Sequence, residues 1–284
     1  HITVRNCEVF DCGTGGIVSL QADYLTYENN LVYNNSWYTI YGGSGISNLN
    51  SWNYDNHSST AYSMIIRNNV VYGNELLVPW INAPCAITDG NGIIIDSQSN
   101  ASTTLTPYSG KTLIENNIVY KNGGRGIHIY ASANCNIKNN TCFFNGKSAA
   151  ISGGEVTVIT STNVTVFNNI MYARTGENAN SKNGSTTGLT FGNNLLFNHI
   201  NSSATFTNIS DIIGLNPQFI DTTVYNFKLQ CSSPAVNAAS TITSQYSAID
   251  INGINRPLGI KPDIGAYEKT GVPTASIALT SNSG

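Results

Sequence analysis

A short motif recurs along the whole chain: two asparagines followed closely by apolar residues and an aromatic residue. From the first copy to the last, the motifs are spaced by 23, 39, 48, 23, 29 and 25 residues, a base period near 23 that insertions lengthen. A period of this length is typical of solenoid proteins, in which a repeat buries its apolar face only against the next repeat. The sequence therefore predicts one elongated stack of coils. The pairs begin at Asn29, Asn68, Asn116, Asn139, Asn168 and Asn193, and a degenerate copy begins at Asn6.

Each repeat has room for three short strands. Apolar residues alternate before the asparagines, as at Leu25 and Tyr27, and this period of two indicates a strand with one buried face. A second apolar strand follows the pair, as at 118–120, and a glycine turn then leads to another alternating run, as at 126–129. Three strands and three bends in one repeat correspond to one coil of an all-β parallel β-helix.

The asparagines themselves have a structural interpretation. Asparagine tolerates the left-handed backbone conformation and bonds neighbouring backbone groups through its amide. Because equivalent residues of successive coils lie above one another, their side-chain amides can form a hydrogen-bonded ladder. We therefore predict a structural role for the paired asparagines.

The spacing also predicts the organisation of the chain. Coils are expected over residues 1–204, with loop insertions at about 36–62 and 75–110. A solenoid needs its last coil covered to protect open strand edges, so residues 205–270 are expected to form a C-terminal coil and cap. Residues 271–284 are expected to be a linker or tail, a candidate for self-association or for attachment to another domain. Because the chain opens inside a repeat strand, at Ile2 and Val4, we expect it to be part of a longer secreted precursor.

Composition limits the partners. Only 10% of the residues are charged, and the net charge of −3 offers no basic field for a nucleic-acid backbone. No apolar run approaches the roughly 18 residues that a membrane span needs. The surface is expected to be rich in uncharged polar groups, which suits hydroxyl-rich ligands. Six cysteines lack the spacing of a zinc site, and we predict that Cys135 and Cys142 are buried free thiols.

Several segments resemble a known superfamily. They are residues 89–96 (DGNGIIID), 111–113 (KTL), 122–128 (NGGRGIH) and the tail 263–268 (DIGAYE). The coils resemble right-handed parallel β-helix proteins of the pectate-lyase-like superfamily, and the segments are similar to those of secreted bacterial members that degrade polysaccharides. The resemblance implies a right-handed parallel β-helix, located outside the cell or on its surface, that binds a polysaccharide. The superfamily includes lyases, hydrolases, epimerases and non-catalytic adhesins, so the fold does not fix the reaction.

Strand alternation predicts one chemically rich face. If Ile127 and Ile129 point inward, His128 and Tyr130 point outward, and Asp96 lies one coil, about 4.8 Å, from Tyr130. The equivalent outward positions are expected at Ser47 and Leu49 in the preceding coil, and at Ser152 and Gly154 in the following coil.

This face suits β-elimination from a uronic acid. The reaction needs a base for the proton at C5, a cation beside the carboxylate, and an acid for the leaving oxygen. We expect Arg125 to neutralise the carboxylate with help from Lys111, and His128 or Tyr130 to act as base. Asp89 and Asp96 are candidate calcium ligands, because calcium takes several oxygen ligands. Their structural alternatives are a turn at Asp89 and a turn cap at Asp96.

The insertions are rich in aromatic residues. Long loops on one side of a solenoid commonly form the binding face. We therefore expect at least one of the loop aromatics to stack against a sugar ring. The candidates are Trp37, Tyr41, Trp52 and Trp80.

Two other functions stay open from the sequence. Asp89 and Asp96 are also candidates for the paired carboxylates of a glycoside hydrolase, which would lie about 5–5.5 Å or 6.5–9.5 Å apart. A solenoid of low charge that ends in a Thr/Ser-rich tail is also typical of a surface adhesin or a subunit of an extracellular filament.

Overall fold

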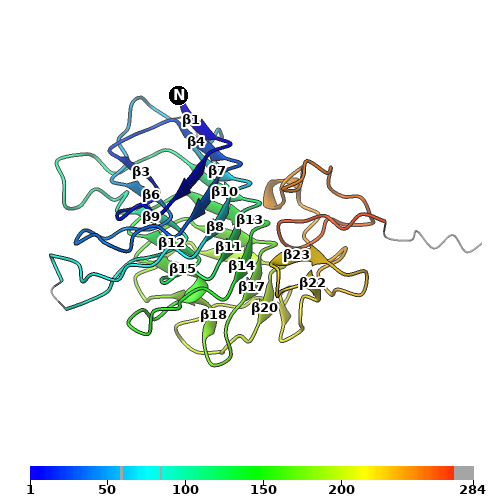
Figure 1. Ribbon diagram of the computed structural model, residues 1–284. Coiled ribbons are helices and arrows are strands. Elements are labelled where there is room, and N and C mark those ends of the chain that lie inside the picture. Colours follow the sequence, from blue (N-terminus) through cyan, green and yellow to red (C-terminus); the bar gives the residue numbers. More distant parts are fainter. Residues whose placement is uncertain (58–59, 84, 272–284) are drawn as a thin grey trace, which may run out of the picture.

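The computed structural model describes residues 1–57, 60–83 and 85–271. In this part of the chain the regular structure is almost entirely β-strand, and one 3-10 turn, η1 (Thr243–Gln245), is the exception. Three parallel sheets form the body, and the chain visits them in a fixed order on every turn (Figure 1). The predicted parallel β-helix is confirmed.

We refer to the three sheets as A, B and C. Sheet A contains β1 (Ile2–Arg5), β4 (Leu25–Glu28), β7 (Met64–Arg67), β10 (Thr112–Glu115), β13 (Cys135–Lys138), β16 (Thr165–Phe167) and β19 (Thr190–Gly192). Sheet B contains β2 (Glu8–Phe10), β5 (Leu31–Tyr33), β8 (Val70–Tyr72), β11 (Ile118–Tyr120), β14 (Thr141–Phe143), β17 (Ile170–Tyr172), β20 (Leu195–Phe197) and β21 (Ile212–Ile213). Sheet C contains β3 (Ile17–Leu20), β6 (Ile46–Leu49), β9 (Ile93–Asp96), β12 (Ile127–Tyr130), β15 (Gly154–Ile159) and β18 (Asn178–Lys182).

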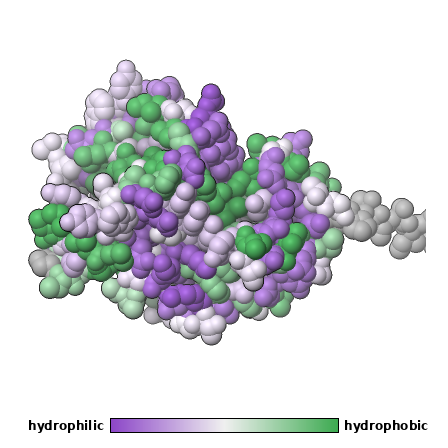
Figure 2. Space-filling model, in the orientation of Figure 1, coloured by the Kyte–Doolittle hydropathy of each residue, from purple (hydrophilic) through white to green (hydrophobic). Residues whose placement is uncertain are grey.

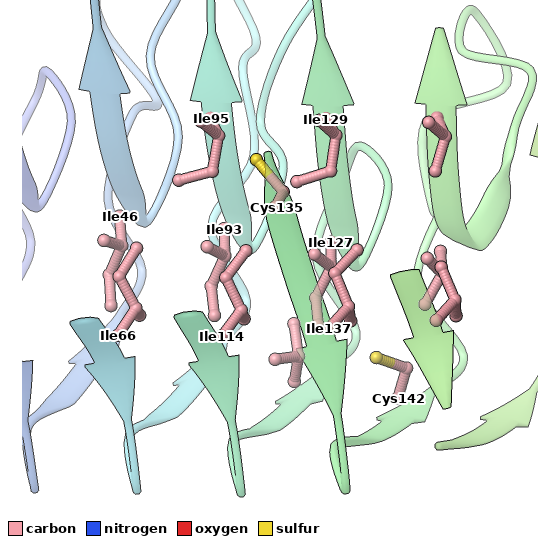
Figure 3. Packing of buried hydrophobic residues seen from close by; sticks show 14 of the residues in the cluster. Ile46, Ile66, Ile93, Ile95, Ile114, Ile127, Ile129, Cys135, Ile137 and Cys142 are labelled. Carbon is pink, nitrogen blue, oxygen red and sulfur yellow. The ribbon is translucent and has the colours of Figure 1, made fainter. Parts of the chain in front are cut away.

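Stacked isoleucines fill the space between the sheets. Ile93 and Ile127 lie in register on neighbouring strands of sheet C, and Ile114 and Ile137 do the same on sheet A (Figure 3). All four side chains are fully buried. Apolar side chains at equivalent positions stack from coil to coil, so each coil buries apolar surface against the next. The two predicted buried thiols, Cys135 and Cys142, lie in this core, and all six cysteines are free.

The asparagine ladder predicted from the repeats is present. The first asparagine of each pair has a left-handed backbone, with φ between 52° and 58° from Asn29 to Asn193. The second asparagine is buried and donates its side-chain amide to the Oδ1 of its counterpart one coil on. Its backbone N–H donates to the same oxygen. The ladder runs through Asn30, Asn69, Asn117, Asn140, Asn169 and Asn194 and ends on Asp211.

A second ladder follows sheet B and ends on a carboxyl group. It runs from Asn35 to Asn145, whose side-chain amide and backbone N–H both donate to Glu155, at 2.5 Å and 3.0 Å. Glu155 is 2% exposed, and burial raises the pKa of its carboxyl to about 8. At neutral pH the carboxyl is therefore mostly protonated.

This carboxyl predicts a pH-dependent stability. A carboxyl whose pKa is higher in the folded state stabilises the fold in its protonated form, so its contribution is complete at low pH and is lost as pH rises. Between the ordinary pKa near 4.5 and the raised pKa near 8, the free energy of unfolding falls by at most about 1.4 kcal/mol per pH unit because of this carboxyl. We expect the Glu155→Gln variant to lack this loss. Urea unfolding of both proteins at several pH values measures the difference, and parallel curves for the two proteins would contradict the prediction.

The chain after β21 lies against the side of the solenoid. Its hairpin of β22 (Phe219–Asp221) and β23 (Asn226–Leu229) and the following loops pack on the outer face of sheet B, at the right of Figure 1. Phe227 and Ile264 share a buried cluster with Tyr120 and Phe143 of that sheet. The cap expected over the last coil at 205–270 stays a prediction; the described part of this segment covers outward aromatic residues of sheet B. Within residues 205–270, Phe206 packs into the solenoid core, where it contacts Phe191.

Charged residues tie this segment together. Arg256 and Glu268 form a buried ion pair at 3.4 Å. Asp250 accepts the backbone N–H of Glu268, and Asp263 accepts that of Asn237. Residues 272–284, most of the expected tail, lie outside the described residues.

Long loops flank sheet C at both ends of its strands. The expected insertion at 36–62 contains β6, and the one at 75–110 contains β9, so each comprises two loops separated by a strand. One loop of each pair precedes a strand of sheet C and the other follows it. None of the described segments is a helix long and apolar enough to cross a membrane.

Candidate functional site

The outer face of sheet C carries two rows of side chains in register. One row contains Ser47, Ile94 and His128, and the other contains Leu49, Asp96 and Tyr130. The predicted juxtaposition of Asp96 and Tyr130 is confirmed. The positions expected in the following coil are wrong: Thr157 and Ile159 take them, in place of Ser152 and Gly154. The connection from β14 to β15 is longer than the repeat suggested, and it shifts the strand by five residues.

His128 and Tyr130 have different surroundings. Both point away from the core, as predicted, and their rings lie 5.8 Å apart. Tyr130 is 42% exposed, but His128 is 5% exposed because neighbouring side chains cover it. Burial, and then the charge of Arg125, lower the pKa of His128 well below its usual value. His128 is thus neutral, and neither ring nitrogen has a hydrogen-bond partner among the described residues. The role of His128 as a base stays a prediction, and its ring is buried in the structure.

Arg125 lies over the same face. It precedes β12, and its backbone N–H donates to Asn91 Oδ1 at 3.0 Å. A methyl group built on Gly153 would lie 2.7 Å from Arg125 Nε and 3.1 Å from Thr157 Oγ1, so the guanidinium group reaches the row that contains His128. Burial lowers the pKa of Arg125, while Asp89 opposes that change. Its Nε is buried and has no acceptor among the described residues, and its Nη1 lies 3.5 Å from the carbonyl oxygen of Thr88.

Asp96 is the carboxylate beside Tyr130. Ser97 Oγ donates to Asp96 Oδ1 at 2.7 Å, which is the local contact expected of a turn cap. Burial nevertheless raises the pKa of Asp96 to about 6, and the charge of Asp89 adds to this effect. A carboxyl that titrates near neutrality can exchange a proton in either direction.

Asp89 is held by its own loop. Thr88 Oγ1 donates to one carboxylate oxygen at 2.8 Å, and Asn91 Nδ2 donates to the other at 3.3 Å. Oδ2, the oxygen that accepts from Thr88, also lies close to Gly42 of the neighbouring loop. Asp89 therefore joins two loops beside Arg125.

The geometry of these carboxylates does not favour calcium. Calcium needs six to eight oxygen ligands. The described residues include no group of three or more His, Cys, Asp or Glu side chains placed to hold a metal ion. Asp89 and Asp96 are bonded to their neighbours, and Arg125 places a positive charge beside Asp89. Calcium stays a prediction, and we derive no step through it.

Lys111 stands apart from Arg125. It precedes β10 of sheet A, whereas Arg125 precedes β12 of sheet C. Its backbone carbonyl accepts the N–H groups of Ser63 and Met64, so it lies where the chain leaves the loops that follow sheet C. The structure thus does not bring Lys111 and Arg125 to one end of the sheet.

The aromatic candidates flank sheet C on both sides. Trp37 and Tyr41, 44% and 66% exposed, lie in the loop that precedes β6, and Trp80 lies partly buried in the loop that precedes β9. These two loops meet where Ile81 N–H donates to the carbonyl of Ile40. Figure 2 shows apolar side chains gathered at this edge of the molecule. Trp52, 46% exposed, lies in the loop that follows β6, at the opposite ends of the strands.

Several solved structures resemble this chain in part. Two are mannuronan C-5 epimerase A-modules of Azotobacter vinelandii: AlgE6 with 17% identity and a TM-score of 0.43, and AlgE4 with 18% and 0.36. The matches cover 75% and 76% of this chain but only 56% of each module, so the chain spans little more than half their length. Pectate lyase Pel9A matches with 16% identity and a TM-score of 0.47, over 92% of this chain and 69% of its own. The three stacked parallel sheets show that the chain has a parallel β-helix fold. No protein-family model and no curated protein matches the sequence, so these likenesses concern the fold alone.

Sequence reasoning missed a second cluster, around His57. This histidine contacts Asp23 and Ser109, which lie 34 and 52 residues away in the chain. No local motif connects the three residues, so only the folded loops bring them together.

Proposed function

We propose that this chain binds an extracellular polysaccharide on the outer face of sheet C and cleaves it by β-elimination at a uronic acid. One observation carries the proposal: the exposed phenol of Tyr130 stands in register beside Asp96, whose carboxyl has a pKa of about 6. An acid and a base are therefore adjacent on a face that the guanidinium group of Arg125 also reaches.

The proposed division of roles follows from the surroundings of each group. Above about pH 6 Asp96 is ionised and takes the proton from C5 of the uronic acid. Tyr130 Oη gives its proton to the glycosidic oxygen as the bond from that oxygen to C4 breaks and a C4–C5 double bond forms. Arg125 binds the uronate carboxylate and stabilises the negative charge that develops on it. His128 stays neutral beneath them, so it adds no charge that competes for the carboxylate.

The surroundings of sheet C suit a long sugar polymer. Exposed aromatic rings at both ends of its strands supply flat apolar surfaces for sugar rings, at Trp37 and Trp52. The low charge of the chain leaves Arg125 as a local cation on a surface of mostly uncharged polar groups. We propose that the protein acts outside the cell, where such polymers occur.

A loss of cleavage in Arg125→Ala tests this assignment. Wild type and variant are incubated with a panel of uronic-acid polymers, with and without a chelator, and the unsaturated product is followed by ultraviolet absorbance. We expect the variant to lose roughly 100-fold in kcat/KM, the cost of removing one preorganised charge partner. Arg67→Ala, which breaks a surface ion pair with Glu28 on sheet A, is the matched control and is expected to keep full activity.

Three other outcomes are informative. New reducing ends without an unsaturated product would replace elimination with hydrolysis. Activity abolished by the chelator would establish a need for a metal ion. No cleavage of any polymer by the wild type would overturn the enzymatic proposal in favour of a binding protein.

A further inference from the structure

We propose that Ser109, His57 and Asp23 form a second catalytic site, which hydrolyses an acyl ester carried by a sugar hydroxyl. The three residues lie at the end of sheet C opposite to Arg125, where the loops that follow β6 and β9 meet the turn after β3. His57 contacts Asp23 Oδ2 through Nε2 at 2.7 Å and Ser109 Oγ through Nδ1 at 3.2 Å. Ester hydrolysis at this site does not depend on the function proposed for sheet C. The inference that a sugar carries the ester rests on that function.

The hydrogen bonds around Asp23 fix the tautomer of His57. Asp23 Oδ1 accepts the backbone N–H of Tyr24 at 2.8 Å and the hydroxyl of Tyr108 at 2.6 Å, and Oδ2 accepts the N–H of Tyr54 at 3.0 Å. A carboxylate surrounded by donors acts as an acceptor, so the neutral ring carries its proton on Nε2. The lone pair of Nδ1 then faces Ser109 Oγ. This is the order of roles in a Ser-His-Asp triad, with the two ring nitrogens exchanged.

His57 and Asp23 are buried and held in place, whereas Ser109 is exposed to solvent. The side chains of His57 and Asp23 are each 3% exposed, and the imidazole lies between the rings of Tyr24 and Tyr108, with centroids at 5.6 Å and 5.0 Å. Ser109 is exposed. Asn53 Oδ1 accepts the backbone N–H of Ser109, at 2.9 Å, which positions the nucleophile. The one hydroxyl proton of Ser109 has two acceptors within reach, Asn53 Oδ1 at 3.1 Å and His57 Nδ1 at 3.2 Å. An exposed hydroxyl against a buried, oriented base is the arrangement that an activated serine needs.

Water is the one co-reactant that this ester hydrolysis needs. Ser109 Oγ attacks the ester carbonyl while His57 Nδ1 takes the hydroxyl proton, and the same proton passes to the departing sugar oxygen. Water then attacks the acyl-serine, His57 takes and returns one proton, and the carboxylic acid leaves.

A neighbouring hollow suits the sugar that carries the ester. Asp23 lines it together with Trp52, Tyr54 and Asp55, and its volume is about 540 Å³. Trp52 offers a ring face, and the carboxylate of Asp55 can accept hydrogen bonds from hydroxyl groups. The carboxylate of Asp55 disfavours a uronate here, so we infer that a neutral, acylated sugar is the ligand.

Hydrolysis of p-nitrophenyl acetate, with covalent labelling by diisopropyl fluorophosphate, tests the site without any polysaccharide. We expect Ser109→Ala to lose at least about 100-fold in kcat/KM and to lose the label, which mass spectrometry places on Ser109 in the wild type. His57→Gln is expected to show the same loss. Ser102→Ala, at an exposed serine in the same loop, is the matched control and is expected to keep wild-type activity and labelling.

Thermal unfolding of each variant separates catalysis from folding. A Ser109→Ala protein that is folded and hydrolyses the ester as fast as the wild type would overturn the proposal and leave the three residues as a clamp between loops. Because the probe is not a polysaccharide, failure of elimination at sheet C does not affect this result. Release of acetate from an acetylated neutral polysaccharide, lost in Ser109→Ala, identifies the carrier as a sugar.

Discussion

Replacing Asn117 with alanine is expected to lower the free energy of unfolding by about 3–6 kcal/mol, because several buried polar groups lose their partners at once. Asn117 Oδ1 accepts the backbone N–H and the side-chain amide of Asn69, at 3.0 Å each. Its own amide donates to the carbonyl of Ile66 and to Asn140 Oδ1, at 2.9 Å each. Asn117 is fully buried, so water replaces none of these bonds without entering the core.

Urea unfolding followed by circular dichroism measures this loss. Asn252→Ala is the control, since Asn252 is exposed and its side chain makes no hydrogen bond in the described structure; we expect a change within about 0.5 kcal/mol. Asn117→Ala unfolding at the same urea concentration as the control would show that the ladder does not stabilise the fold.

The ladder also shows why the fold was predictable from the sequence. A solenoid applies the same constraint to every coil, so residues such as Asn69, Asn117 and Asn140 repeat in the sequence as they stack in space. The alternation of Ile127 and Ile129 fixed the inward face of sheet C for the same reason, and it brought Asp96 beside Tyr130. Repetition therefore predicts strands, register and core together.

Features outside the repeat were not predictable in this way. The outward aromatic residues of sheet B, such as Tyr120 and Phe143, carry no sign in the sequence that a later segment covers them. The burial of His128 was not predictable, because alternation decides the direction of a side chain but not what lies over it. The contacts of His57 with Asp23 and Ser109 join separate loops. Loops do not repeat along the chain, so the sequence contains no periodic pattern that predicts these contacts.

Within the proposed elimination site, Tyr130→Phe and Asp96→Asn are each expected to lower kcat/KM by about 100-fold to 10,000-fold, because each removes one proton-transfer group. Phenylalanine keeps the ring beside His128 but has no hydroxyl, and asparagine keeps the shape of Asp96 but cannot take a proton. Initial rates of unsaturated-product formation measure both losses. A Tyr130→Phe enzyme with full activity would move the acid role to another group.

The pH dependence assigns the base independently of these losses. The base acts when ionised, so the kcat/KM of the wild type is expected to rise with pH through the pKa of Asp96, about 6. The hydroxyl of Ser97 lowers that pKa by donating to the carboxylate. Ser97→Ala, which removes this donor without touching the acid or the arginine, is therefore expected to move the rise to higher pH. If the profile is the same in both proteins, Asp96 is not the base, and the proton at C5 is taken by a group that Ser97 does not contact.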